Sequence, residues 1–327
     1  MAAPNAVFTE LVTTTFRKHG KEIKDNVSKN NALLRKLDDK GMTRKEDGGL
    51  TIVGMLDYAN NSTYQRYSGY DVLNIGASEV ISAAEYQWRQ IAINVVASGL
   101  ELRVNSGDSR IVSLAKARIK NAMRTFKNNF SADVYGDGTL PNQIGGLQAL
   151  VSDTGGGTIG GIDSSVWTFW RNLVQSAAAP LQGGGAITPS ATTIESLMLP
   201  LYLALTRGDD QPDLIVMDNN YFTFFEASQT SIKRYTNDGS KAGTAAAGFT
   251  SLKYKTADVI FDGGSGIPIN HMYFLNTDYI ELVVHKDADL NIMEEMKPFN
   301  QDASIIPILW MGNLICTNRS LQGVGKA

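Results

Sequence analysis

Three glycines, Gly155, Gly157 and Gly160, have the spacing of the dinucleotide-binding fingerprint, in which backbone amides hold a pyrophosphate at the start of a helix. The residues that follow, 161–165, contain a glycine and two serines and predict a loop rather than a helix. The motif is also not set in a strand–helix–strand unit. We therefore do not expect a nucleotide cofactor at these glycines.

The other residue types that support catalysis are scattered. The three histidines have no metal-ligand spacing, and the paired acids are adjacent, so that their side chains diverge on a helix or a strand. The serine of the segment 263–266 lacks the glycines of a nucleophile elbow. The residues considered are His19, His271, His285, Asp209, Asp210, Glu294, Glu295 and Ser265. We expect no enzyme, no metal and no cofactor.

The composition excludes several further kinds of site and several classes of protein. A single cysteine, Cys316, excludes a disulfide within the chain and a multi-cysteine zinc site, and its apolar neighbours predict a buried thiol. The net charge of −3 gives no global attraction to nucleic acid or anionic lipid. The longest apolar run has nine residues, 197–205, which is too short to cross a bilayer. With no leader pattern in residues 1–20, we expect neither secretion nor contact with a membrane.

The first forty residues predict one long helix that ends at Gly41, with a break left open at residues 29–31. Its apolar stripe is narrow and flanked by Lys and Arg. We expect this helix to lie on a neighbouring surface, the alternative being an ordinary surface helix. The stripe consists of Phe8, Leu11, Val12, Thr15, Phe16, Ile23, Val27, Leu34 and Leu37; of these, Phe8, Leu11 and Phe16 are predicted to contact another subunit.

Four of the twelve tyrosines, Tyr58, Tyr64, Tyr67 and Tyr70, lie within thirteen residues, in a pattern that fits neither a helical stripe nor strict alternation. Tyrosine provides a large contact area and tolerates one wet edge, which suits interfaces. We interpret the segment as a projecting two-stranded arm that binds another molecule; the alternative is a loop folded onto its own domain.

Two alternating segments, 91–95 and 100–104, predict half-buried antiparallel strands. A long helix follows over residues 109–134, with apolar residues at every third or fourth position. Its opposite face is basic. A solvated face is the simpler explanation, and contact with a polyanion is the alternative; for the latter the candidate residues are Lys116, Lys120 and Lys127.

Glycine-rich connections fill residues 136–185, and a more compact alternating unit follows. Thr192 and Glu195 match a capping box before an apolar helix that ends near Gly208, and Asp218 is expected to cap a short helix. Strands are predicted at 213–217, 255–261, 272–275, 280–284 and 305–315. The chain is therefore an α+β protein.

Several short blocks, in collinear order, resemble the major capsid proteins of tailed bacteriophages, which have the Hong Kong 97-type fold. The resemblance covers most of the chain from Trp88 onward. The blocks are Trp88-Arg89-Gln90, Ser98-Gly99-Leu100-Glu101, Tyr135-Gly136-Asp137-Gly138-Thr139, Ile144-Gly145-Gly146-Leu147, Gly160-Gly161-Ile162-Asp163, Phe169-Trp170-Arg171-Asn172, Arg207-Gly208, Pro212-Asp213-Leu214-Ile215-Val216-Met217-Asp218, Pro298-Phe299-Asn300-Gln301-Asp302, Gly312-Asn313-Leu314 and Asn318-Arg319-Ser320-Leu321-Gln322-Gly323.

The resemblance implies four parts. They are an N-terminal arm (1–48), an extended loop (49–87), a peripheral domain with a spine helix at 109–134 (88–190 and 277–327), and an axial domain (191–276). It also implies self-assembly through hexamers and pentamers into an icosahedral shell around double-stranded DNA, in the host cytoplasm and then the virion. Scaffolding, portal and decoration proteins are the further partners it implies.

Three alternatives remain open. A cellular nanocompartment shell shares this fold but encloses enzyme cargo, a tail-tube or sheath protein assembles as open helices, and an oxidoreductase would use the glycine-rich stretch to bind a dinucleotide.

Overall fold

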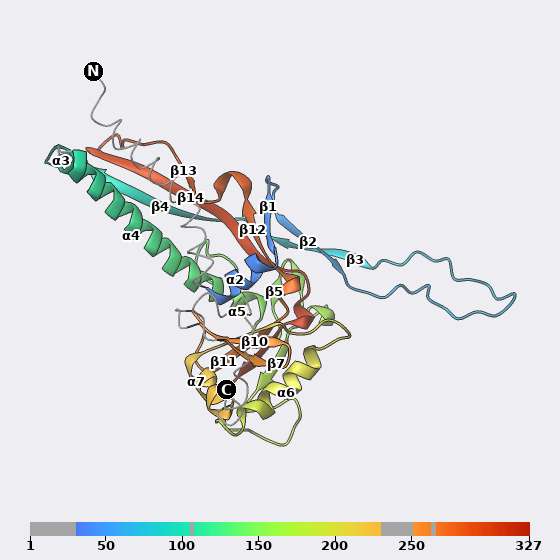
Figure 1. Cartoon of the computed structure of the whole chain (residues 1–327). Helices are drawn as coiled ribbons and strands as arrows, with labels where there is room; N and C mark the ends of the chain where they lie inside the picture. Colours follow the sequence, from blue (N-terminus) through green and yellow to red (C-terminus); the bar gives the residue numbers. More distant parts are fainter. Residues whose placement is uncertain (1–30, 105–107, 230–250, 263–265) are drawn as a thin grey trace.

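The computed structural model describes residues 31–104, 108–229, 251–262 and 266–327, arranged as an elongated body with one long hairpin that projects from it (Figure 1). The helical stripe predicted across Phe8, Leu11 and Phe16 lies outside these residues. The short elements not treated below are α5 (Leu147–Leu150), β5 (Thr158–Ile159), β6 (Ile162–Asp163), η1 (Thr168–Trp170), η4 (Thr277–Tyr279), η5 (Lys286–Ala288) and η6 (Arg319–Leu321).

The first sheet is built on one long strand, β14 (Ala303–Cys316). One edge of β14 pairs antiparallel with β4 (Arg89–Ser98), and the other edge pairs with β12 (Ile280–His285) and β13 (Asn291–Ile292). A short strand, β1 (Thr43–Glu46), extends the sheet by pairing in parallel with β12. The strands predicted at 280–284 and 305–315 are confirmed, and Cys316 is buried at the end of β14 as expected.

The long helix α4 (Asp108–Tyr135) covers one face of this sheet (Figure 1). Its buried residues recur at three- and four-residue spacing, from Ile119 through Met123 and Phe126 to Phe130. Phe130 meets Trp310 of β14 edge to face, with ring centroids 4.8 Å apart. The predicted helix is therefore confirmed, and it begins one residue earlier and ends one residue later than expected.

The strand predicted at 100–104 is wrong, because Gly99–Val104 forms a short helix, α3. The reason is a capping box in which the Ser98 Oγ accepts from the Glu101 N–H (3.2 Å) and the Glu101 Oε2 accepts from the Ser98 N–H (3.1 Å). Alternation of apolar residues over so few positions does not distinguish a strand from a helix.

The second sheet has six strands in the order β7-β15-β11-β8-β10-β9. Its central strand β8 is buried on both faces: Ile215 and Met217 face α6 and α7, and Leu214 and Val216 face the core shared with the first sheet. Such a strand has the continuous apolar run that the sequence shows. The bounds are β7 (Leu173–Ser176), β8 (Leu214–Met217), β9 (Ser251–Tyr254), β10 (Ala257–Phe261), β11 (His271–Leu275), β15 (Gly323–Lys326), α6 (Ile194–Leu205) and α7 (Asn219–Ser228).

In this unit the predicted start of α7 is confirmed, whereas the predicted start and end of α6 are wrong. Asp218 caps α7 as expected, since its carboxylate accepts from the Asn220 and Tyr221 N–H groups. The capping box of Thr192 and Glu195 does not form: α6 begins after Thr193, whose side chain caps nothing, and Glu195 accepts instead from Gln229 at 2.6 Å. The helix also ends at Leu205 rather than near Gly208.

Strand pairing also modifies the expected boundaries of the domains. Residues 173–176 and 323–326, assigned above to the domain of the long helix, are β7 and β15 of the second sheet. Both segments therefore belong to the sheet of the unit expected at 191–276, and the four-part division itself stays a prediction.

The described part of the N-terminal segment is a short helix, α2 (Ala32–Asp39), which begins after an extended Asn31 and is followed by Gly41 at a φ of 72°. The described part of the possible break, Asn31, is extended rather than helical. Leu33, Leu34 and Leu37 are buried in the protein's own core. The expectation that this helix lies on a neighbouring surface is wrong for Ala32–Asp39, and residues 31–46 are part of the body.

Candidate assembly surfaces

The tyrosine-rich segment forms the projecting arm that the sequence predicts. β2 (Ile52–Asp57) and β3 (Ile81–Tyr86) pair antiparallel over six residues, and the chain between them extends away from the body (Figure 1). We call residues 59–79 the tip; the root is the paired strands together with Tyr58 and Val80, which are joined by a backbone hydrogen bond of 2.9 Å. The root lies against the body, whereas the tip reaches beyond it.

One of the four tyrosines belongs to the root. The Tyr58 ring stacks on Phe169 with centroids 5.5 Å apart, and it meets Trp167 edge to face at 5.9 Å. All three residues belong to the same chain, so the alternative of packing on its own domain holds for Tyr58. That Tyr58 also contacts another subunit stays a prediction.

Backbone and side-chain contacts fix the direction of the root. The Tyr86 hydroxyl donates to the Cys316 carbonyl (2.8 Å) and accepts from the Cys316 N–H (3.3 Å), and burial raises the pKa of Tyr86 so that the hydroxyl keeps its proton. The Glu85 N–H donates to the Gly160 carbonyl at 2.9 Å. Gly160 has a φ of 59°, and a Cβ there would lie 2.8 Å from the Ala84 Cβ, so only glycine fits this close approach.

The tip carries exposed apolar and aromatic side chains. Tyr64, Tyr67 and Tyr70 are 80%, 66% and 105% exposed, and Val72, Leu73 and Ile75 lie on the same tip. Side chain–backbone bonds hold its two sides together, among them Gln65 Nε2 to the Val72 carbonyl (3.0 Å) and the Asn74 N–H to Gln65 Oε1 (3.2 Å). A grouped apolar surface on a thin element is typical of a protein–protein contact.

The basic face predicted for α4 is described only from residue 117 onward. Lys120 and Arg124 are exposed and Lys127 is half-buried, whereas the side chain of Lys116 lies outside the described part. Arg118 is tied to Glu101 at 2.7 Å and to the Val96 carbonyl. The hydrogen bonds from Arg118 and from the Ser98 N–H hold the pKa of Glu101 below its usual value.

A further exposed apolar group was missed by the sequence analysis. Leu100 and Val104 of α3 and Phe299 are all more than two-thirds exposed. They lie near the end of the first sheet, where the Gly99 N–H donates to the Asp302 carbonyl at 2.8 Å. The capping box at Ser98 and Glu101 is the signal that would have predicted α3 and its exposed face.

The fingerprint glycines have another role in the structure. Gly155, Gly157 and Gly160 all have positive φ angles. Gly155 and Gly157 precede the β5–β6 hairpin and Gly160 lies in its turn, so none of them is in a turn from strand to helix. Among the described residues, no group of three or more His, Cys, Asp or Glu side chains is arranged to hold a metal ion. Within the same residues, no helix is long and apolar enough to span a bilayer.

Comparison with known proteins gives no match at the level of sequence and a clear match at the level of structure. No protein-family model and no curated protein matches the chain. A chain of the cyanophage A-1(L) capsid is similar at a TM-score of 0.65 and 15% identity, over 88% of this chain and 90% of that one.

Two further solved structures have the same architecture. A capsid chain of the native GTA particle matches at a TM-score of 0.52 and 12% identity, over 88% of each chain. A capsid chain of Myoviridae phage XM1 matches at 0.52 and 10% identity, over 89% of this chain and 91% of that one. The chain therefore has the fold of tailed-phage capsid proteins, the Hong Kong 97-type fold that the sequence resemblance implied.

Proposed function

We propose that this chain is the major capsid protein of a tailed bacteriophage and that it self-assembles into the icosahedral shell around the phage's double-stranded DNA. The observation that carries the proposal is a fixed root with an exposed apolar tip, on a body that has the capsid fold. A monomer gains nothing from such a tip, whereas a second copy that covers it removes the apolar surface from water.

The geometry suits repeated contacts between copies. A closed shell requires heterologous contacts, in which one surface of each copy meets a different surface of the next. The tip provides the first of these surfaces, and its distance from the body lets it reach the next copy. Each contact is modest in strength, because the many contacts of a shell act together. Hexamers and pentamers of the same chain are the assemblies we expect.

The expected partners follow from this role. DNA would lie near Lys120 and Lys127 on the open face of α4. Scaffolding, portal and decoration proteins complete the set of partners, and assembly takes place in the host cytoplasm before the protein becomes part of the virion.

Electron microscopy of the purified, overexpressed chain tests the proposal. We expect closed, roughly spherical particles with hexameric and pentameric units. Open tubes would identify a tail-type assembly instead, and a concentrated sample that stays monomeric would contradict self-assembly.

The DNA contact has a separate test. We expect the charge reversals Lys120→Glu and Lys127→Glu to leave shells intact but to weaken DNA retention by about tenfold at moderate salt, because each removed phosphate contact weakens binding and lowers its salt dependence. The readout is the DNA content of purified particles, and Lys253→Glu, an exposed lysine of β9, is the control. Unchanged DNA content would contradict the proposal that α4 faces the DNA on the inner surface of the shell.

A further inference from the structure

The short helix α2 bridges α4 and the second sheet. At its N-terminal end, the buried Asn31 side chain donates to Ser131 Oγ at 2.9 Å and accepts from the Tyr135 hydroxyl at 3.2 Å. Ser131 and Tyr135 both belong to the C-terminal part of α4. The Ala32 N–H also donates to Asp262 Oδ2 at 3.3 Å, just after β10, so this end of α2 lies where α4 meets the second sheet.

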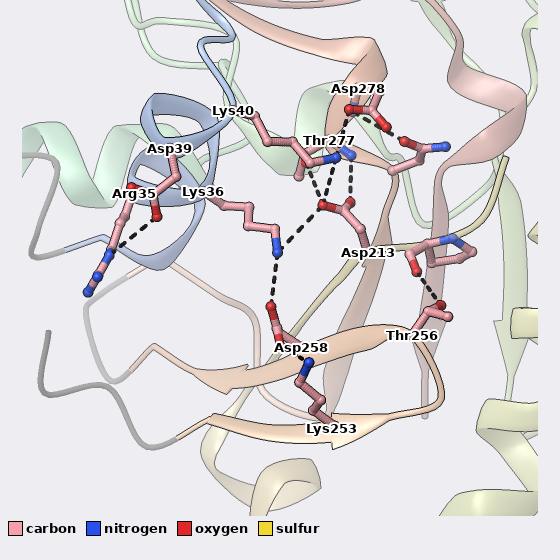
Figure 2. Close-up of polar contacts among 12 residues, drawn as sticks. Arg35, Lys36, Asp39, Lys40, Asp213, Lys253, Thr256, Asp258, Thr277 and Asp278 are labelled. Carbon is pink, nitrogen blue, oxygen red and sulfur yellow. Dashed lines mark hydrogen bonds and ion pairs between the residues drawn. The ribbon is translucent and has the colours of Figure 1, made fainter. Parts of the chain in front are cut away.

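Two lysines of this segment attach it to the second sheet (Figure 2). Lys36 Nζ lies 2.9 Å from Asp258 Oδ2 in β10, and Lys40 Nζ lies 3.1 Å from Asp213 Oδ2, the residue before β8. Lys40 also lies 2.7 Å from Asp278 Oδ1 in η4. Burial lowers the pKa of Lys40, but the hydrogen bonds and charges of Asp278 and Asp213 outweigh it and leave this pKa raised, so the lysine is charged at neutral pH.

The acceptors of this contact are positioned without α2. The two carboxylate oxygens of Asp213 accept from the Thr277 N–H (2.8 Å) and the Thr277 hydroxyl (2.7 Å). Lys253 of β9 is largely exposed and lies 4.0 Å from Asp258 on the other side, too far and too solvated to add much to this contact. The second sheet therefore holds its side of the contact whether or not α2 is docked.

The helix itself depends on being docked. An isolated helix of eight residues is not stable in water, because it has too few hydrogen bonds to offset nucleation. Gly41, at a φ of 72°, ends it and separates it from β1. A short docked element next to such a joint is typical of a unit that opens locally while the rest of the protein stays folded.

We propose that α2 is a clasp: its lysine–aspartate pairs dock it on the second sheet, and it opens as a unit while both sheets stay folded and stay packed on α4. Opening releases residues 31–41 from the body. The buried leucines provide most of the attachment, and the ion pairs set the position at which the helix docks.

Hydrogen exchange on the full chain tests the clasp, with the double variant Lys36→Gln/Lys40→Gln compared with Lys253→Gln. The control removes a lysine that contacts the same Asp258 from outside α2. We expect amides 33–40 to exchange about tenfold faster in the double variant, because α2 loses the ion pairs that join it to Asp258, Asp213 and Asp278. In the double variant, exchange in β12 and β14 is expected to stay unchanged. In the control, exchange is expected to stay unchanged in α2 as well as in β12 and β14.

A salt series on the unmodified chain gives a second readout that needs no variant. Raising the salt from about 0.05 M to about 0.5 M is expected to speed exchange in α2 by about threefold, since these pairs are partly exposed and thus partly screened. This salt effect should vanish in the double variant. Equal acceleration in α2, β8 and β14 would show general unfolding and overturn the proposal, as would unchanged exchange in α2. None of these outcomes depends on shell formation.

Discussion

At the scale of single residues, one buried arginine joins three segments of the body. Arg319 is fully buried, and its guanidinium donates to the carbonyls of Leu150 (2.7 Å) and Trp170 (3.0 Å) and to the Asn172 side chain (3.0 Å). These groups lie in the connections between the two sheets, where little regular structure satisfies the backbone. The guanidinium thus provides these carbonyls with hydrogen-bond donors that a helix or strand would otherwise supply.

We expect Arg319→Met to lower the free energy of unfolding by about 3 kcal/mol, because the buried carbonyls lose their donors. Urea unfolding of dissociated subunits measures this difference. The exposed Arg207, whose Nη1 lies 2.9 Å from Ser320 Oγ, is the matched control, and Arg207→Met is expected to change stability by less than about 0.5 kcal/mol. Equal effects of the two substitutions would mean that the Arg319 contacts contribute little.

Single residues also explain why parts of the fold could not be predicted. The strand β15 contains Gly323 and Gly325, which weaken any strand pattern, yet both are required: a Cβ would lie 2.7 Å from Leu205 Cδ1 at the first position and 2.4 Å from Met272 Cε at the second. The ion pairs of Lys36 and Lys40 join residues more than 170 positions apart in the sequence. Neither the glycines of β15 nor these ion pairs can be predicted from neighbouring residues in the sequence.

At the scale of elements, the sequence predicts best where one period continues over many residues. The bounds of α4 agree to within a residue because its apolar stripe covers more than six turns. The short α3 was mistaken for a strand, and the letters of a capping box at Thr192 were misleading, because a cap depends on where the helix starts. For the candidate surface, the clustered tyrosines predicted the arm, but the tertiary stack of Tyr58 on Phe169 was not predictable from spacing.

Loss of the exposed rings of the tip is expected to reduce assembly without reducing the stability of the subunit. We expect the triple variant Tyr64→Ser, Tyr67→Ser and Tyr70→Ser to keep the stability of the isolated subunit within about 0.5 kcal/mol, since all three rings are exposed. The yield of closed particles is expected to fall by at least about tenfold, because aromatic anchors carry much of the energy of an interface.

The matched control for this variant is Tyr58→Phe, which keeps the ring stack at the root and should assemble normally. Particle yield is measured by sedimentation, and subunit stability by urea unfolding. Normal yield from the triple variant would show that the tip is not an assembly contact.

At the scale of the whole molecule, two sheets share one core and a hairpin reaches out from their junction (Figure 1). Contacts of Tyr58 and Tyr86 hold the root on the body, and apolar surface is exposed at the tip and at Phe299. The central claim is that the tip becomes buried only when copies of the chain meet.

Hydroxyl-radical footprinting of Tyr64, Tyr67 and Tyr70, in assembled particles and in dissociated subunits, tests this claim most directly. Labelling is expected to fall severalfold on assembly at these three rings, while the exposed side chain of Thr223 on α7 serves as an internal reference. Equal labelling of the three tyrosines in the two states would contradict the account.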